Sequence, residues 1–492
     1  MRFRRVLAAV LLFAATAFSQ TQDFTVVALP DTQHYSKYYP AIYAAQTRWI
    51  VQNAAAMNIQ FVLGLGDIVD DGEQNFQWQN ADAAVRILDQ AGMRYAMAIG
   101  NHDYMFGSVS SRDATLFNQY FGPLRYHGRS YYRGSYPAGS NENFWTVFDV
   151  AGVPYLVMLL ETFPRDAALN WAASVLAANR DKQAIIVTHS YMFKDNSRIG
   201  RCDSNTAASF GVAQDNDGDQ MWSKFVSRQP NVFLVLNGHT NGAGRRADIG
   251  TNGNLISQVL ADYQDDPHGG NGWLRILKFR PALNLIEVRT YSPYLNQWLT
   301  DSNNQFTLKI HDWPASSSGA LEGRVRSSSC APLSGVTISA GGHSTVTGAQ
   351  GLFSLPLPAP AAYTATAAKS GWKSGSVSAS VPRAYPAWAD FFLASASPST
   401  SCTLSSVSPS VTICAPTASA SVSSPVRITG GATSSAGVRF VQVYVDGLKA
   451  YEALAPTLDT SLPILPGTHR LTVQAGDKAG AIFKQTIYIT VK

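Results

Sequence analysis

The chain has 492 residues, of which 46% are hydrophobic and 14% are charged. This composition is globular and excludes an intrinsically disordered protein, and the length predicts about two to four domains rather than one core. The net charge of +5 comes without the dense basic stripe of a nucleic-acid-binding protein, so we do not predict specific nucleic-acid binding.

The first residues have the pattern of an export signal. In residues 1–20, MRFRRVLAAVLLFAATAFSQ, arginines precede an unbroken apolar run that ends in small residues. The pattern predicts a secretory signal peptide over residues 1–19. The run is too short to span a bilayer, and no later segment is long and apolar enough to do so. We therefore expect a secreted protein, extracellular or periplasmic, without a transmembrane anchor.

Four cysteines fit an exported chain, where disulfides can form. None of them makes a C-x-x-C pair, so a zinc knuckle is not expected. Cys402 and Cys414 are close in sequence and form the predicted disulfide. For Cys202 and Cys330 the sequence leaves both free thiols and a bond open.

Short apolar runs alternate with segments of helical spacing as far as residue 312. Helical spacing is found at residues 40–57, 80–91 and 166–180. The alternation predicts an α/β sheet layered with helices. The runs that we interpret as buried strands are residues 24–29, 61–65, 95–99, 155–160, 184–187 and 232–236.

The pattern changes after residue 318 to short alternating strands punctuated by glycine and proline. A Ser/Pro/Thr-rich stretch at 397–404 is typical of a linker. We therefore predict one large domain over residues 22–312, followed by two small β-sandwich domains over 316–396 and 405–492.

Five polar clusters follow the predicted strands directly, at the ends where ligand sites of α/β sheets occur. Each has an ordinary structural explanation when taken alone. An acid after Pro30 suits a turn, carboxylates can cap helices, and histidines can bond to backbone carbonyls. Five such clusters at strand ends instead favour one shared site. They are DTQ at 31–33, GDIVD at 66–70, GNHD at 100–103, THS at 188–190 and GHTN at 238–241.

Together the clusters resemble the motifs of the calcineurin-like metallophosphoesterase family: D-x-H, G-D-x-x-D, G-N-H-[DE], a lone histidine and G-H-x-H. The resemblance extends over about residues 23–312. It implies an α/β (α+β) four-layer sandwich, followed here by two small all-β sandwich domains. It also implies a hydrolase of phosphoester or phosphoanhydride bonds that uses water activated by two divalent metal ions, ~3.5–4 Å apart.

The resemblance also implies roles for individual residues. His102 would stabilise the pentacovalent phosphorus or protonate the leaving oxygen. Asp70 would keep His102 protonated, cap a helix, or do both. One metal ion would be held by Asp67, Asn101, His189 and His239. The other would be held by Asp31, Gln33, Asp67 and Asn241.

Two positions depart from the family pattern, because Gln33 and Asn241 stand where histidines are expected. The ligand set becomes all oxygen, which favours harder ions. We therefore predict Mn²⁺, with Fe, Zn and Mg as alternatives. Neutral amides bind metal weakly, so this position could stay empty until substrate or excess metal arrives. His34 would replace Gln33 only if the local register slipped by one residue.

The C-terminal segments resemble two module types. GRV…PLSGVTIS is similar to carboxypeptidase regulatory-like modules, and VQVYVDG…PGTHRLTVQA to bacterial immunoglobulin-like modules. Such modules act as spacers or hold an enzyme to a cell surface or polysaccharide matrix. The expected substrate is a phosphorylated small molecule or a phosphodiester. The alternative hypothesis is a non-catalytic extracellular binding or adhesion protein on a degenerate phosphoesterase scaffold.

Two further segments carry weaker signals. The run DNDGD at 215–219 begins like a calcium loop, but Gln220 and Val226 occupy the positions that require glycine and glutamate, so we predict a solvated loop. The glycine-rich run HGGNGW at 268–273 lacks phosphate-loop spacing. It is interpreted as a plain turn that could pass close to the site.

Overall fold

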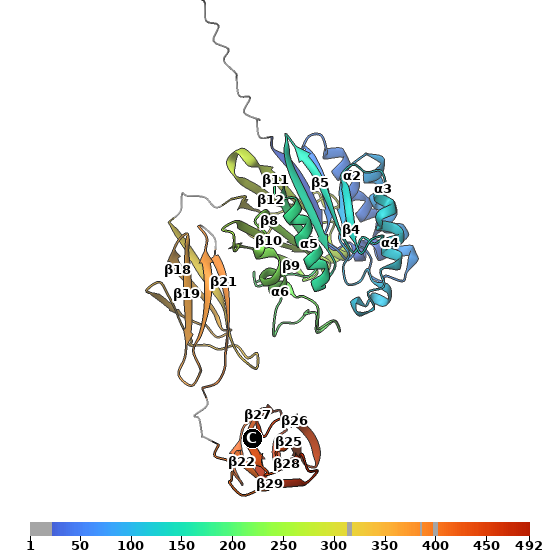
Figure 1. Cartoon of the computed structure of the whole chain (residues 1–492). Helices are drawn as coiled ribbons and strands as arrows, with labels where there is room; N and C mark the ends of the chain where they lie inside the picture. The colour runs from blue at the N-terminus through green and yellow to red at the C-terminus, as the bar shows by residue number, and fades with distance from the viewer. Residues whose placement is uncertain (1–21, 312–316, 384–385, 397–401) are drawn as a thin grey trace, which may run out of the picture. The chain divides into compact units, whose positions relative to one another are not determined.

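The computed structural model describes residues 22–311, 317–383, 386–396 and 402–492 (Figure 1). The predicted signal peptide and residues 397–401 of the predicted linker lie outside the described residues. Among the helices of the described segments, none is both long and apolar enough to cross a bilayer.

The first sheet of the N-terminal domain has seven strands in the order β13-β12-β11-β1-β2-β3, with β14 beside β12. β1, β2 and β3 run parallel to one another, whereas β11 is antiparallel to β1. The strands are β1 (Phe24–Leu29), β2 (Ile59–Gly64), β3 (Tyr95–Met97), β11 (Leu274–Arg280), β12 (Leu285–Ser292), β13 (Gln297–Leu299) and β14 (Phe306–Lys309).

The second sheet also has seven strands, in the order β4-β5-β6-β7-β8-β10-β9. Its central strands β6, β7, β8 and β10 are parallel, and β9 is antiparallel to β10. The strands are β4 (Tyr132–Tyr136), β5 (Asn143–Val150), β6 (Val153–Leu160), β7 (Gln183–Thr188), β8 (Val232–Asn237), β9 (Gly242–Ile249) and β10 (Leu255–Asp262).

The helices of this domain connect the strands. The α-helices are α1 (Gln33–Tyr38), α2 (Pro40–Asn53), α3 (Asn75–Gln90), α4 (Thr115–Phe121), α5 (Asp166–Ala178), α6 (Gly218–Lys224) and α7 (Pro267–Gly270). Short 3-10 turns are η1 (Met105–Gly107), η2 (Val109–Ser111), η3 (Pro123–Tyr126), η4 (Val226–Arg228) and η5 (Pro281–Leu283).

The two sheets pack face to face through aromatic side chains. The ring of Phe24 on β1 lies 5.0 Å from that of Tyr155 on β6, and Phe61 on β2 lies 5.0 Å from Phe148 on β5. On the outer face of the second sheet, apolar residues of β6 and β7 share a buried cluster with α5 and α6. The helices α2 and α3 pack side by side and bury residues such as Trp78 in the other core (Figure 1). The predicted four-layer sandwich is confirmed.

The first small β-sandwich pairs a three-stranded sheet, β18-β15-β21, with a four-stranded sheet, β17-β16-β19-β20. It clusters with the N-terminal domain in one compact unit. Its strands are β15 (Ser318–Ser327), β16 (Thr337–Ala340), β17 (His343–Val346), β18 (Leu352–Pro358), β19 (Ala361–Ala368), β20 (Gly375–Val381) and β21 (Pro386–Leu393).

A disulfide joins this sandwich to the N-terminal domain. Cys202 and Cys330 are bonded, with their Cα atoms 5.4 Å apart. Beside the bond, Arg326 Nη2 lies 2.6 Å from Asp203 Oδ1. The pairing that the sequence left open is therefore a link between the two folded regions.

The second sandwich forms its own compact unit. A three-stranded sheet, β22-β24-β27, packs on a five-stranded sheet, β23-β29-β28-β25-β26. The predicted disulfide Cys402–Cys414 is confirmed. The strands are β22 (Ser410–Ala415), β23 (Ser421–Val422), β24 (Val426–Thr433), β25 (Val438–Val445), β26 (Leu448–Ala453), β27 (Thr457–Leu462), β28 (Gly467–Asp477) and β29 (Ile482–Val491).

Candidate metal centre

The polar clusters of the two sheets meet in one buried group. Parallel strands end at the same edge of a sheet, so β1, β2 and β3 present their following residues together, as do β7, β8 and β10. Two contacts join the edges. Asp31 Oδ2 accepts the backbone N–H of His239 at 3.0 Å, and Asp67 Oδ2 lies 3.1 Å from His189 Nε2. Residues that are far apart in sequence therefore form one site.

The orientation of His189 is fixed by a backbone carbonyl. Its Nδ1 lies 3.0 Å from the oxygen of Leu65, which can only accept a hydrogen bond. With the hydrogen on Nδ1, Nε2 is the ring atom that faces Asp67 Oδ2 and Asn101 Oδ1, each at 3.1 Å, and it can carry either a proton or a metal ion. A histidine anchored in this way by its other ring nitrogen is the usual arrangement of a metal ligand.

The electrostatic field at this point favours positive charge. Burial alone would lower the pKa of the His189 imidazole, but the carboxylates of Asp67 and Asp31 outweigh burial and raise it to about 10. Burial alone would likewise raise the pKa of Asp67, yet His189 and His102 hold it well below its usual range. A proton or a metal ion can supply the charge that the carboxylates require.

The backbone around Asp67 brings its carboxylate against the neighbouring loop. Asp67 adopts a φ of +46°, an uncommon conformation for a residue with a side chain, of a kind that clusters at functional sites. Its Oδ1 accepts the backbone N–H of His102 at 2.9 Å. A Cβ atom at Gly100 would collide with that same carboxylate. The glycine of the GNHD cluster is therefore required by the close approach.

His239 presents an uncommitted nitrogen to the same group. Its buried Nε2 has no hydrogen-bond partner among the described residues. Burial and the nearby His189 lower its pKa to about 3, so the ring is neutral and keeps its lone pair. Ligand atoms of Asp67, His189 and His239 lie within 4.8 Å of one another. The rings of Phe163 and Phe210 lie 6.1 and 5.4 Å from the His239 ring.

Asp31 and Gln33 add two buried oxygens without partners. Both side chains are almost fully buried, and Asp31 Oδ1 and Gln33 Oε1 accept no hydrogen bond from the described residues. A Cβ atom at Gly238 would collide with Asp31 Oδ1, so that glycine permits the approach. Buried acceptors without a partner are costly, and a cation would satisfy both of these. The residues present thus fit a bound metal ion.

Asn241 does not lie where the motifs predict it, and Asp262 occupies a buried position that no motif predicted. Asn241 is exposed, and its amide nitrogen donates to Asp265 Oδ2 at 2.9 Å. The structure does not bring it into the buried group. Asp262 at the end of β10 is fully buried instead, and burial together with Asp67 and Asp265 raises its pKa to about 7. Sequence reasoning missed Asp262, although LISQVLAD is a largely apolar run that ends in a carboxylate, as at the other strand ends.

His102 lies at the rim of the group with its side chain 37% exposed. Its Nδ1 lies 2.7 Å from the backbone oxygen of Asp70, whereas the Asp70 carboxylate is 4.0 Å away and pairs with Lys37. Burial opposes protonation, but Asp67 and the Asp70 carbonyl outweigh it and raise the pKa of His102 above its ordinary value. The residue that caps α3 is Gln74, so the helix-cap alternative for Asp70 is wrong.

Comparison with known families assigns each folded region. Residues 24–245 match the calcineurin-like phosphoesterase family, residues 320–394 the carboxypeptidase regulatory-like domain, and residues 409–473 the bacterial Ig domain. Within the N-terminal domain the match is therefore to the calcineurin-like phosphoesterase family. The resemblance inferred from the strand-end motifs is confirmed, as are both modules.

One curated relative and two solved structures are similar to this chain. Uncharacterized protein YvnB of Bacillus subtilis (strain 168) is 33% identical over 301 residues, which cover 58% of this chain and 22% of YvnB. The chain thus matches only about a fifth of that relative's length.

The two structures are more distant in sequence. Purple acid phosphatase PPD1 from yellow lupin seeds is 15% identical with a TM-score of 0.38, covering 59% of this chain and 54% of that one. GAP50 of Plasmodium, described as the anchor in the inner membrane complex, is 12% identical with a TM-score of 0.35, covering 59% and 89%. At these scores neither structure bears on chemistry.

The segments beside Gln33 keep the expected register. His34 does not replace Gln33, because its Nδ1 lies 3.1 Å from the backbone oxygen of Gln264 and its Nε2 lies 3.6 Å from Asp70. The glycine-rich run at 268–273 passes here, since a Cβ atom at Gly269 would meet the His34 side chain. That run is a neighbour of the candidate metal centre.

The DNDGD run is not the solvated loop that the sequence suggested. Asp215 is buried and lies 2.5 Å from Arg112 Nη2. Asp217 caps α6 in a capping box with Gln220. Asp215 therefore binds the loop that carries Arg112, and Asp217 begins α6. These two roles explain why part of the run is buried.

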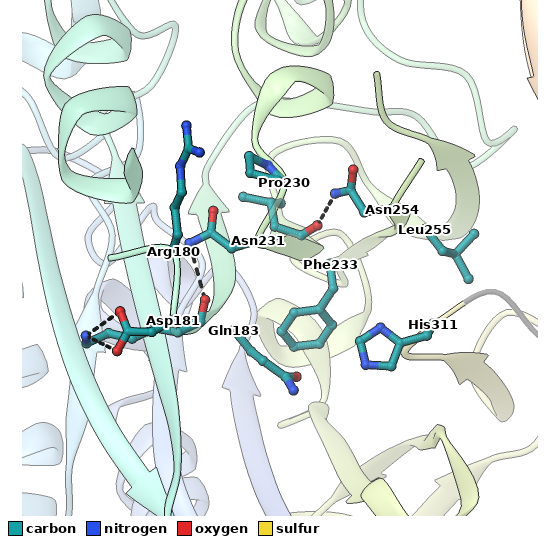
Figure 2. Close-up of a pocket in the computed structure, with 11 residues that line it drawn as sticks. Arg180, Asp181, Gln183, Pro230, Asn231, Phe233, Asn254, Leu255 and His311 are labelled. Carbon is teal, nitrogen blue, oxygen red and sulfur yellow. Dashed lines mark hydrogen bonds and ion pairs between the residues drawn. The ribbon is translucent and has the colours of Figure 1, made fainter. Parts of the chain in front are cut away.

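A separate cavity lies at the other end of the second sheet (Figure 2). It has a volume of about 330 Å³ and is lined by residues at the starts of β7, β8 and β10, among them Gln183, Val232 and Leu255. Ligand sites in open α/β sheets lie beyond the carboxyl ends of strands. This cavity at the amino ends is therefore not part of the metal centre.

Proposed function

We propose that this chain is a secreted, metal-dependent phosphoesterase that hydrolyses phosphoester or phosphoanhydride bonds. The observation that carries the proposal is the convergence of His189 Nε2, Asp67 Oδ2 and Asn101 Oδ1 in a buried group of the phosphoesterase domain. Unpartnered atoms of Asp31 and His239 belong to the same group. Buried polar atoms of this kind contribute nothing to the packing of an apolar core.

The proposed ligands divide into two positions. When bound, divalent ions would polarise a phosphoryl oxygen and make water a better nucleophile at neutral pH. Oxygen ligands at the second position support Mn²⁺ as the proposed ion. The first position would use Asp67, Asn101, His189 and His239, and the second would use Asp31, Gln33 and Asp67, while the exposed side chain of Asn241 argues against its expected part.

His102 is proposed to handle the proton of the leaving oxygen. The Asp70 carbonyl accepts from Nδ1, which leaves Nε2 as the free ring atom of a partly exposed side chain. The backbone N–H of His102 also holds Asp67 Oδ1 in place. One loop thus orients a metal-binding carboxylate and places a general acid beside it.

Export and attachment form the remaining part of the proposal. Two disulfides suit an oxidising compartment, in agreement with the expected signal peptide. The carboxypeptidase regulatory-like and bacterial Ig domains would hold the enzyme to a cell surface or polysaccharide. The substrate would be a phosphorylated small molecule or a phosphodiester.

Metal reconstitution tests this function directly. The purified chain without residues 1–19 is stripped with a chelator and reloaded with Mn²⁺, Mg²⁺, Zn²⁺ or Fe²⁺. Each form is assayed on bis-p-nitrophenyl phosphate, p-nitrophenyl phosphate and ADP-ribose, together with a metal count per chain. We expect Mn²⁺-dependent hydrolysis with about two ions bound. No hydrolysis with any metal would leave the non-catalytic binding protein as the better explanation.

A further inference from the structure

We propose that Asp262 is a metal ligand that replaces the missing imidazoles at the second metal position. This inference rests on the metal centre of the proposed function and assigns a residue outside the strand-end motifs. It is argued from the place of Asp262 in the sheet, from its burial, and from an oxygen that has no partner.

The sheet topology places Asp262 at the same sheet edge as the candidate metal centre. β10 is parallel to β8, with Leu260 opposite Asn237, so both strands end at the same edge. β10 is also antiparallel to β9, with Asp262 opposite Gly242. Asp262 therefore lies beside the GHTN turn, next to the place from which Asn241 points outward to Asp265.

The carboxylate of Asp262 is buried without a counter-ion. Its Oδ1 accepts the backbone N–H of Gln264 at 2.9 Å, whereas its buried Oδ2 has no hydrogen-bond partner. Within the described segments, no basic side chain forms an ion pair with it. Burying a charge is expensive unless the charge is paired or binds a metal.

A second buried carboxylate in the same domain shows what a structural role looks like. Asp248 forms ion pairs with Arg198 and Arg246 and accepts a hydrogen bond from Gln258. Asp262 has no comparable set of donors. Its free oxygen therefore needs a different partner, and the neighbouring atoms indicate a cation.

The proposed second metal position offers two further buried oxygens without partners. Asp31 Oδ1 and Gln33 Oε1 are buried and accept no hydrogen bond from the described residues. Asp31 is close enough to Asp262 for the two side chains to interact electrostatically. Two carboxylates and an amide oxygen form a ligand set for a hard divalent ion such as Mn²⁺ or Mg²⁺. The carboxylate would restore the ligand that Asn241 does not supply.

The test compares Asp262→Asn with the matched control Asp149→Asn in the purified chain. Asp149 is exposed and, like Asp262, accepts one backbone N–H, that of Gly152 at 2.8 Å. Both changes remove one charge and leave an amide oxygen to accept that hydrogen bond. Mn²⁺ per chain is counted at saturation, and the melting temperature is measured with and without Mn²⁺, so that binding is scored without any assay of turnover.

We expect Asp262→Asn to lose about one of two bound Mn²⁺ ions and most of the thermal shift that this ion causes. The Mn²⁺-free variant should melt no lower than the wild type, because no ion pair is lost. Asp149→Asn should behave as the wild type in both respects. If Asp262→Asn does not fold, Asp262→Glu takes its place, with Mn²⁺ affinity reduced about tenfold.

Three results would overturn the assignment. They are an unchanged Mn²⁺ count and thermal shift in the Asp262 variant, the same loss in the Asp149 control, and a wild-type chain that takes up only one ion at saturation. If the wild-type chain binds two ions but hydrolyses no substrate, the proposed function is contradicted. The Mn²⁺ counts of Asp262→Asn and Asp149→Asn would still decide whether Asp262 is a ligand.

Discussion

The candidate metal centre has two unlike halves. The imidazole half, made of Asp67, Asn101, His189 and His239, keeps the family motifs. His189 Nε2 lies 3.1 Å from both Asp67 Oδ2 and Asn101 Oδ1, and ligand atoms of Asp67, His189 and His239 lie within 4.8 Å of one another. The proposed oxygen half, made of Asp31, Gln33 and Asp262, keeps only the aspartate of those motifs, and each of its members has a buried oxygen without a partner.

The difference between the halves is one of ligand chemistry rather than architecture. Each half is built beyond the ends of parallel strands, and each depends on a glycine that lets a carboxylate approach: Gly100 for Asp67 and Gly238 for Asp31. The scaffold is thus retained where the ligands have changed. The halves should consequently differ in which ion they prefer and in how tightly they hold it.

The largest effect is expected where the two halves share a ligand. Asp67→Asn removes the carboxylate that faces His189 and is proposed to serve both positions. We expect the metal count to fall in both halves and turnover to fall at least about 1000-fold, or roughly 4 kcal/mol in the barrier. Metal analysis and steady-state assays check this. Loss of metal from one half only would contradict the shared role.

His102→Ala should separate turnover from metal binding. His102 contacts Asp67 through its backbone N–H, and its side chain is not a proposed ligand, so both positions should still load. We expect kcat to fall about 100- to 1000-fold, which is typical for the loss of a general acid, at an unchanged metal count. The control is His127→Ala, which removes an exposed histidine. Full activity in the His102 variant would favour the non-catalytic alternative.

The imidazole half could be predicted from the sequence because its residues follow continuous apolar runs. The run at 61–65 ends just before Asp67, and the run at 184–187 ends just before His189. Buried parallel strands are apolar on both faces, so their ends are visible in the sequence. The order of the motifs then supplied the family and, with it, the four-layer fold.

In the oxygen half, Asp31 and Gln33 could be predicted from the sequence but Asp262 could not, because polar residues interrupt the apolar run of β10. β10 buries Ser257 and Gln258, and Gln258 is accommodated by hydrogen bonds with Asp248 on β9 and with Arg198 in the segment between β7 and α6. Without those partners, which are distant in sequence, the run did not indicate a buried strand. The same limit applies to Cys202 and Cys330, whose pairing depends on a contact across 128 residues.

Gln33→His should make the ligands of the oxygen half more similar to those of the imidazole half. The substitution places an imidazole at a side chain that is 3% exposed and has a free oxygen in the wild type. We expect the preference of the oxygen half to move from Mn²⁺ toward Zn²⁺ by about tenfold, because nitrogen ligands suit zinc. Competition binding of the two ions checks the shift. The control is Gln52→His on the exposed face of α2. An equal shift in metal preference in this control would contradict a role for Gln33 as a ligand.

The smallest effect is expected for Asn241→Ala, although the family pattern places a metal ligand at this position. The Asn241 side chain is exposed and donates to the Asp265 carboxylate, so its removal costs one surface hydrogen bond. We expect the Mn²⁺ count to be unchanged and kcat/KM to change by less than about threefold, below 1 kcal/mol. A loss of one ion in this variant, with Asp262→Asn unaffected, would reverse the roles of the two residues. The contrast between these variants decides whether the oxygen half lost a ligand at the GHTN turn or moved it to the end of β10.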